Sequence, residues 1–205
     1  MIDLLSTVRF VPSYPMLNNP TSQTKFGGRV ISTVEFVDPY RTVDMETQPM
    51  KASEAVQLQA FIASAKGGME TIVYRPKHIC IPRAYWGDPN NSHITGTASR
   101  GTVTDGYTVQ LTGVVPGLQL MDGDMFSLKS GEYRQFLQIA YGGGATAVST
   151  TITVKVDQPI ASYIATGATA RFKQPEMNTR LVKDSFQMSK GPRPTATFQL
   201  IEVPK

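Results

Sequence analysis

The sequence predicts a mainly β fold with one substantial helix. Its 205 residues include 17 glycines and 14 prolines, which supply many turns, and only 18% of the residues are charged, which is low for a helical protein. Helical periodicity occurs in one segment, whereas short strand patterns bounded by Gly and Pro recur along the rest of the chain. A chain of this length can bury a real core, as one large domain or as two small ones.

The first 48 residues predict an extended arm followed by a β-hairpin. A possible strand at 7–11 is followed by three prolines before residue 21, which prevent regular pairing. Beyond them, Arg29–Val37 and Arg41–Gln48 are β-prone, and the sequence VDPY between them favours a turn. In the second segment Val43 and Met45 alternate with acidic residues, which predicts one buried and one solvent-facing side.

The segment Ala52–Lys66 is the predicted helix. Ser53 is the expected N-cap, and Gly67 can adopt the left-handed conformation that closes a helix. An apolar stripe with helical spacing is formed by Leu58, Phe61, Ile62 and Ala65. We expect this stripe to be buried, and a strand at Glu70–Tyr74 to follow the helix.

A second series of strands begins after Trp86. Tight turns separate them and helical periodicity is almost absent, which favours a small closed barrel of the OB type. The five predicted strands are Ile94–Ala98, Tyr107–Leu111, Met125–Leu128, Glu132–Tyr141 and Thr150–Val156. Residues 93–170 are therefore predicted to form an inserted OB-like barrel domain.

The last part of the chain predicts a return to the first domain. Ala168–Lys173 and Thr179–Lys183 are strand-like, and Thr195–Val203 alternates with apolar residues on both faces. A strand of this kind favours a central position in a sheet. We therefore expect residues 1–92 and 171–205 to form one discontinuous β-sandwich-like domain.

Signals of chemistry are weak in this sequence. His78 and His93 lie in no metal-binding spacing, and Cys80 stands alone between two isoleucines as a small hydrophobe would. The triple glycine Gly142–Gly144 lacks the Gly-Lys-Ser/Thr of a phosphate-binding loop and is interpreted as a hairpin tip. We expect no enzyme, no metal and no cofactor.

Binding functions remain open as alternatives. An OB barrel can stack bases on aromatic side chains, and the candidates for a single-stranded nucleic-acid module are Phe126, Tyr133, Phe136 and Tyr141. Alternating aromatic residues on short strands are more often part of the core, and this is the favoured interpretation of the four. The net charge of +4 is scattered, so nucleic acid is not an expected partner. A carbohydrate-binding module is the other alternative. Contacts with a peripheral partner or a sugar are assigned to Trp86, Tyr107 and Tyr141. For Trp86 the favoured alternative is a lid on the junction between the two domains. No stretch approaches the roughly 18 apolar residues of a membrane span, so membrane insertion is not expected.

Four segments carry a resemblance to a known family. They are SQTKFGGRVISTVEF, ASEAVQLQAFIASAKGGMETIVYRP, GDMFSLKSGEYRQFLQIAY and ITVKVDQPIASYIATGATARF. In this order they resemble the distal tail proteins of long-tailed bacteriophages, in the form where a β-sandwich ring domain carries an OB-like barrel. The resemblance runs over nearly the whole chain, without any catalytic or ligand motif.

This resemblance implies a structural protein of the virion, assembled in the host cytoplasm. Family members form a hexameric ring at the distal end of the tail, in the tail tip or baseplate, and join the tail tube protein to the hub or tip proteins. Some also contact carbohydrate on the host surface. The hairpin of residues 30–47 and the first arm would supply the ring interface, with Val30, Val34, Phe36, Val43 and Met45 as candidates. The barrel would be peripheral.

Overall fold

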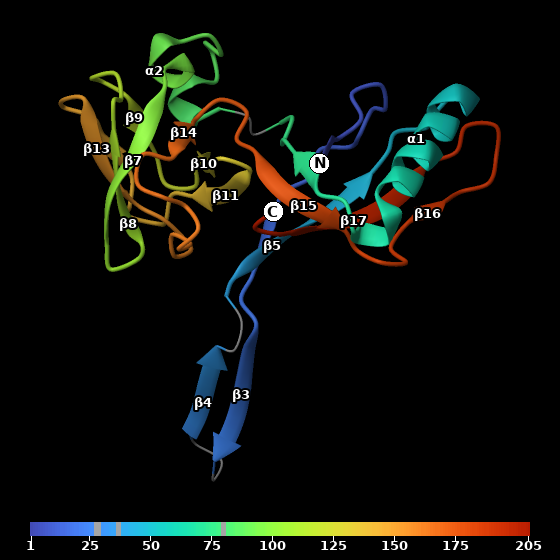
Figure 1. Ribbon diagram of the computed structural model, residues 1–205, viewed down its shortest axis with the longest axis horizontal. Coiled ribbons are helices and arrows are strands. Elements are labelled where there is room, and N and C mark those ends of the chain that lie inside the picture. Colours follow the sequence, from blue (N-terminus) through green and yellow to red (C-terminus); the bar gives the residue numbers. More distant parts are fainter. Residues whose placement is uncertain (27–29, 36–37, 79–80) are drawn as a thin grey trace. The chain divides into compact units, whose positions relative to one another are not determined.

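A computed structural model describes residues 1–26, 30–35, 38–78 and 81–205 (Figure 1). The fold is mainly β with one main helix, which confirms the predicted fold class. The chain divides into two compact units, both discontinuous. Unit 1 comprises residues 1–5, 70–179 and 204–205, and unit 2 comprises residues 6–69 and 180–203. The predicted inserted segment, 93–170, lies within unit 1.

Unit 1 is built around a six-stranded antiparallel sheet in the order β11-β10-β14-β7-β8-β13 (Figure 1). An isolated bridge between Ile139 and Val156 links the residues that follow β11 and β13, so the two end strands meet. The strands are β7 (Ala98–Thr104), β8 (Thr108–Thr112), β10 (Met125–Ser130), β11 (Tyr133–Gln138), β13 (Thr151–Lys155) and β14 (Thr169–Arg171). The sheet has six strands, whereas the predicted OB-like barrel has five. The structure therefore does not show an OB barrel, and the OB type remains a prediction.

The observed elements differ from the predicted strands of this region at two places. The prediction of a strand at Ile94–Ala98 is wrong, because Ser92–Thr95 forms the short helix α2 and the strand begins at Ala98. The Asn91 side chain accepts the His93 N–H and caps this turn. The additional strand, β14, comes from the strand-like segment 168–173, and it inserts between β10 and β7.

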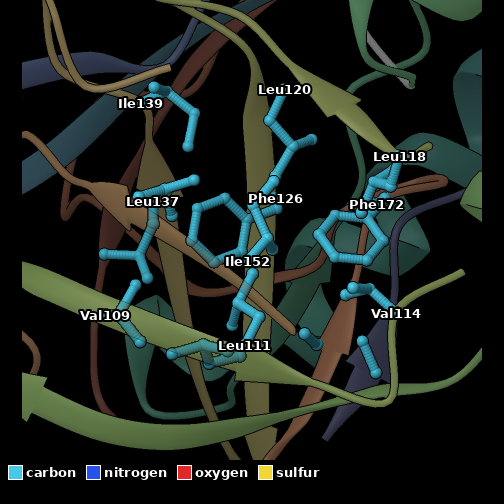
Figure 2. Close-up of a cluster of buried hydrophobic side chains, with 14 of the residues drawn as sticks. Val109, Leu111, Val114, Leu118, Leu120, Phe126, Leu137, Ile139, Ile152 and Phe172 are labelled. Atoms are coloured by element: carbon cyan, nitrogen blue, oxygen red, sulfur yellow. The ribbon is translucent and has the colours of Figure 1, made fainter. Parts of the chain in front are cut away.

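One cluster of buried hydrophobic side chains fills the space that the six-stranded sheet encloses, and Figure 2 shows part of this cluster. The alternate residues of β8 and β13 that point inward are buried, as the period of a strand requires. Phe126 and Phe172 meet with ring centroids 6.2 Å apart. Phe126 and Phe136 are completely buried, which confirms the core interpretation of these two side chains and excludes them as base-stacking platforms. Burial of each such side chain contributes about 1.5–3 kcal/mol.

Unit 1 also contains β1 (Ile2–Asp3), β6 (Ile72–Tyr74) and the first part of β15 (Met177–Leu181). β6 pairs in parallel with β1 and antiparallel with β15. All three residues of β6 are buried, in agreement with the strand predicted at 70–74. Two further short strands of this unit, β9 (Gln119–Leu120) and β12 (Ala145–Thr146), pair with each other.

The helix of unit 2, α1, spans Ala52–Ser64. Ser53 lies inside it, so the predicted N-cap is wrong. Lys51 occupies the cap position and its backbone N–H donates to the Glu54 carboxylate at 2.7 Å. Gly67 has φ 64° in the short 3-10 turn Lys66–Gly68 after the helix, as its predicted closing role requires. The predicted stripe is buried at Leu58, Phe61 and Ala65 and half-buried at Ile62.

The sheet of unit 2 contains β2 (Met16–Asn18), β5 (Tyr40–Glu46), β16 (Gln187–Met188) and β17 (Ala196–Glu202). β17 pairs with β5 along one side, and its other side pairs with β16 and with β15, whose last two residues belong to this unit. The predicted central position of the final strand is thereby confirmed. Its apolar face is buried at Ala196, Phe198 and Leu200.

The predicted pairing of Arg29–Val37 with Arg41–Gln48 is wrong for the residues described. β4 (Val30–Glu35) pairs instead with β3 (Thr21–Phe26), and β5 pairs with β2 and β17. Closing β3 on β4 needs a short connection, since Phe26 is paired with Val30. The buried face of β5 meanwhile holds that strand in the larger sheet. The predicted strand at 7–11 reduces to one bridge, between Phe10 and Thr47.

Candidate functional site

The two histidines of unit 1 lie in different surroundings. His93 is held structurally: Nδ1 lies 2.6 Å from Asn91 Oδ1, Nε2 lies 3.1 Å from the Pro116 carbonyl, and the ring stacks on Tyr85. Burial lowers the pKa of His78. Within the described ranges, no three His, Cys, Asp or Glu side chains are placed to hold a metal ion. Cys80 lies outside the described residues.

Two aspartates organise the loops at one end of the six-stranded sheet. The buried Asp124 carboxylate accepts the backbone N–H groups of Arg83 at 3.0 Å and Met121 at 2.8 Å. Asp122 accepts those of Gly142 at 2.8 Å and Gly144 at 2.9 Å, and these bonds lower the pKa of Asp122. Two amides of the glycine loop, those of Gly142 and Gly144, are therefore already bound to a carboxylate, and the Gly143 amide donates to the Ala140 carbonyl.

Tyr141 is displayed by this glycine loop. Tyr141 is 98% exposed. The two glycines that follow Gly142 cannot be replaced by a residue with a Cβ atom unless neighbouring backbone atoms move. A Cβ on Gly143 would lie 2.6 Å from the Lys155 carbonyl oxygen, and one on Gly144 would lie 2.8 Å from that of Leu120. Tyr141 is thus an exposed aromatic side chain on a tightly packed support.

The three residues assigned to a peripheral partner or sugar, Trp86, Tyr107 and Tyr141, are all exposed, and we call them the aromatic surface. Backbone hydrogen bonds bring Tyr107 and the residue before Tyr141 to the end of β13. Val156 N–H donates to the Tyr107 carbonyl, and Ala140 N–H donates to the Lys155 carbonyl, both at 2.9 Å. Trp86 follows the 3-10 turn Arg83–Tyr85. Because the Arg83 guanidinium contacts the Asp122 carbonyl, that turn lies beside the glycine loop.

A charge cluster centred on the buried Glu176 occupies another part of unit 1. Glu176 accepts hydrogen bonds from Arg134 Nε at 2.7 Å, from Arg75 Nη2 at 2.9 Å, and from Arg171. Burial raises the pKa of the Glu176 carboxyl, but the bonds from Arg134 and Arg75 and the charge of Arg171 outweigh it and hold that pKa below its usual range. Every carboxylate oxygen is satisfied within the protein, so this cluster is a structural one.

The candidate ring-interface residues divide into three groups. Val43 and Met45 are buried inside unit 2, where they pair with Leu200 and Phe198 across the sheet. Their side chains therefore offer almost no surface to a neighbour, which counts against their assignment to a subunit interface. Val30 and Val34 lie on β4, which pairs with β3 in a separate two-stranded sheet. Phe36 lies outside the described residues.

Two surface hollows lined by described residues of unit 2 were missed by sequence reasoning. One, of about 320 Å³, is lined by Asp44, Met45, Glu46, Ser185, Thr197, Phe198 and Gln199, and we call it the acidic hollow. The other, of about 260 Å³, is lined by Arg9, Gln48, Pro49, Met50, Lys51, Glu54 and Arg193, and we call it the basic hollow. The alternation of Asp44 and Glu46 signalled an exposed acidic face. Nothing local signalled that Arg193 would join Arg9.

Comparison with protein-family models and with curated proteins found no match for this chain. Of the helices that the structure describes, none has the length and apolar character to span a membrane.

Proposed function

We propose that this chain is a structural virion protein without enzymatic activity, which forms a hexameric ring at the distal end of a phage tail and joins the tail tube to the hub or tip. The observation that carries self-assembly is the β3–β4 hairpin. Its two strands pair with each other and with no other described strand. An isolated two-stranded hairpin is marginally stable in water, so this one needs a partner.

A second copy of the chain is the partner that this geometry supports best. The outer edges of β3 and β4 carry backbone donors and acceptors that no other described strand takes up, and such edges template pairing with another chain. Homo-oligomers with closed symmetry are the commonest soluble assemblies. The hexameric state, the tail tube and hub partners, the location in the virion and assembly in host cytoplasm come from the family resemblance.

Unit 1 is assigned the peripheral role. Its aromatic surface supports contact with another tail protein or with carbohydrate on the host, because exposed aromatic rings on a rigid support bind at low entropic cost. A nucleic-acid function is less well supported, since two of its four candidate stacking residues, Phe126 and Phe136, are buried. A steep fall of single-strand binding with added salt would be the sign of that alternative.

The hairpin can be removed without cutting the sheet of unit 2. Asn18 of β2 is paired with Tyr40 of β5, so replacing residues 19–39 by Asn-Gly closes a direct β2–β5 hairpin. We expect this variant to fold but to remain monomeric in sedimentation velocity, while the wild-type protein forms sixfold rings in negative-stain images.

The matched control for that experiment is Tyr141→Ser, which changes an exposed side chain in unit 1 and should leave the rings intact. Wild-type protein that stays monomeric at every concentration, or rings that persist without the hairpin, would refute the proposal. Far-UV circular dichroism of each variant establishes that it is folded.

A further inference from the structure

The two hollows of unit 2 carry opposite charge. We propose that the basic hollow of one copy docks on the acidic hollow of the next, in a salt-sensitive head-to-tail contact. This inference rests on the proposed function, because it names a second pair of surfaces, besides the β3–β4 hairpin, through which copies of the ring protein meet.

The basic hollow is assembled from three chain segments by backbone bonds. Gln48 N–H donates to the Arg9 carbonyl, and Met50 N–H to that of Pro194, both at 2.9 Å. These bonds bring Arg9 and Arg193 beside Lys51, where α1 begins. None of the three cations forms an ion pair with another residue that the structure describes.

One carboxylate, that of Glu54, also lines the basic hollow. It accepts the Lys51 backbone N–H at 2.7 Å, so it is engaged at the start of the helix. Three cations and one carboxylate leave a formal charge of +2 at this surface. A positive helix N-terminus adds to the same field. A carboxylate-bearing surface is the complement of this hollow.

The acidic hollow lies on the exposed face of the sheet. Asp44 is paired with Gln199 and Glu46 with Thr197, so the two carboxylates point to the same side, away from the buried Val43 and Met45. The Gln199 side chain donates to Asp44 at 2.8 Å. Neither carboxylate forms an ion pair with a described residue, and the formal charge of the hollow is −2.

Charge complementarity on one chain points to a second copy as the occupant. A head-to-tail contact needs two different surfaces on each subunit, and it leaves one surface of each kind free for the next copy. The opposite formal charges, +2 and −2, satisfy that requirement. Exposed charges of this sort set the register and the encounter rate of a complex more than its affinity.

Charge-reversal variants of the full chain test this pairing. Arg9→Glu with Arg193→Glu makes the basic hollow acidic, and Asp44→Lys with Glu46→Lys makes the acidic hollow basic. We expect each double variant to self-associate at least about tenfold more weakly than wild type in sedimentation velocity at low salt. An equimolar mixture of the two should recover assembly, because each hollow then meets its complement on the other variant.

The control Lys155→Glu with Lys173→Glu makes the same change in net charge as the arginine variant, but in unit 1, and should assemble as wild type does. Thermal melts establish that all variants are folded. If wild type is monomeric, the ring proposal fails and this pairing with it. If wild type assembles and the reversals have no effect, or the mixture fails to recover assembly, the pairing alone is overturned.

Discussion

Replacing Glu176 by Gln should destabilise unit 1 strongly. The change keeps the shape of the side chain but removes the negative charge that faces Arg134, Arg75 and Arg171. Removing one partner of a buried ion pair costs about 3–5 kcal/mol, because the other charge stays buried without compensation.

We expect the loss of stability on replacing Glu176 by Gln to lie near the lower end of the range of about 3–5 kcal/mol. The side chains of Glu176 and Arg134 are 4% and 9% exposed, so this pair is almost completely buried. Arg75 and Arg171 are 38% and 46% exposed, and Arg75 also keeps its bond to Asp3 at 2.8 Å. We therefore expect a loss of about 3 kcal/mol in the free energy of unfolding at neutral pH, arising mainly at Arg134.

The pH dependence follows from the lowered pKa of Glu176. A carboxyl whose pKa is lower in the folded state stabilises the fold above its unfolded pKa, which is about 4.3 for Glu, and this stability is lost as the pH falls through the folded pKa. The Gln variant carries no such charge. The difference in stability between wild type and variant should therefore shrink in acid.

Urea unfolding at a series of pH values measures this difference. Trp86 is the single tryptophan of the chain and lies in unit 1, so its fluorescence reports on the unfolding of that unit. Circular dichroism is recorded on the same samples. Glu132→Gln is the control, since its carboxylate is exposed and pairs with the exposed Lys205, and it should change stability little. Equal stability of Glu176→Gln and wild type at neutral pH, or a loss that does not diminish in acid, would refute the reasoning.

Two further changes test the packing of each unit. Gly143→Ala should lower the stability of unit 1 by about 1–3 kcal/mol, because its Cβ would lie 2.6 Å from the Lys155 carbonyl; a melting temperature equal to that of wild type would contradict this. Leu58→Ala should cost about 2–5 kcal/mol in urea unfolding, because the side chain is completely buried in α1. Val56→Ala, at an exposed position of the same helix, is its control and should stay within about 0.5 kcal/mol.

Features that depend on local pattern could be predicted from the sequence. The stripe Leu58, Phe61 and Ala65 located the helix, because residues at this spacing lie on one helical face whatever covers them. The two apolar faces of Thr195–Val203 likewise placed β17 inside a sheet. These signals are carried by neighbours along the chain, so no tertiary information was needed.

The choice of partners was decided by the tertiary structure. Residues 30–35 have the same β-prone character whether they pair with 21–26 or with 41–46, and the burial of Val43 and Met45 against β17 settled that choice. The same burial counts against both residues as interface candidates. Arg9, Lys51 and Arg193 gather in one hollow only because backbone bonds join segments remote in sequence. The sequence alone determined which segments are helix and strand candidates, whereas pairing, burial and surface charge depended on long-range contacts that local periodicity does not encode.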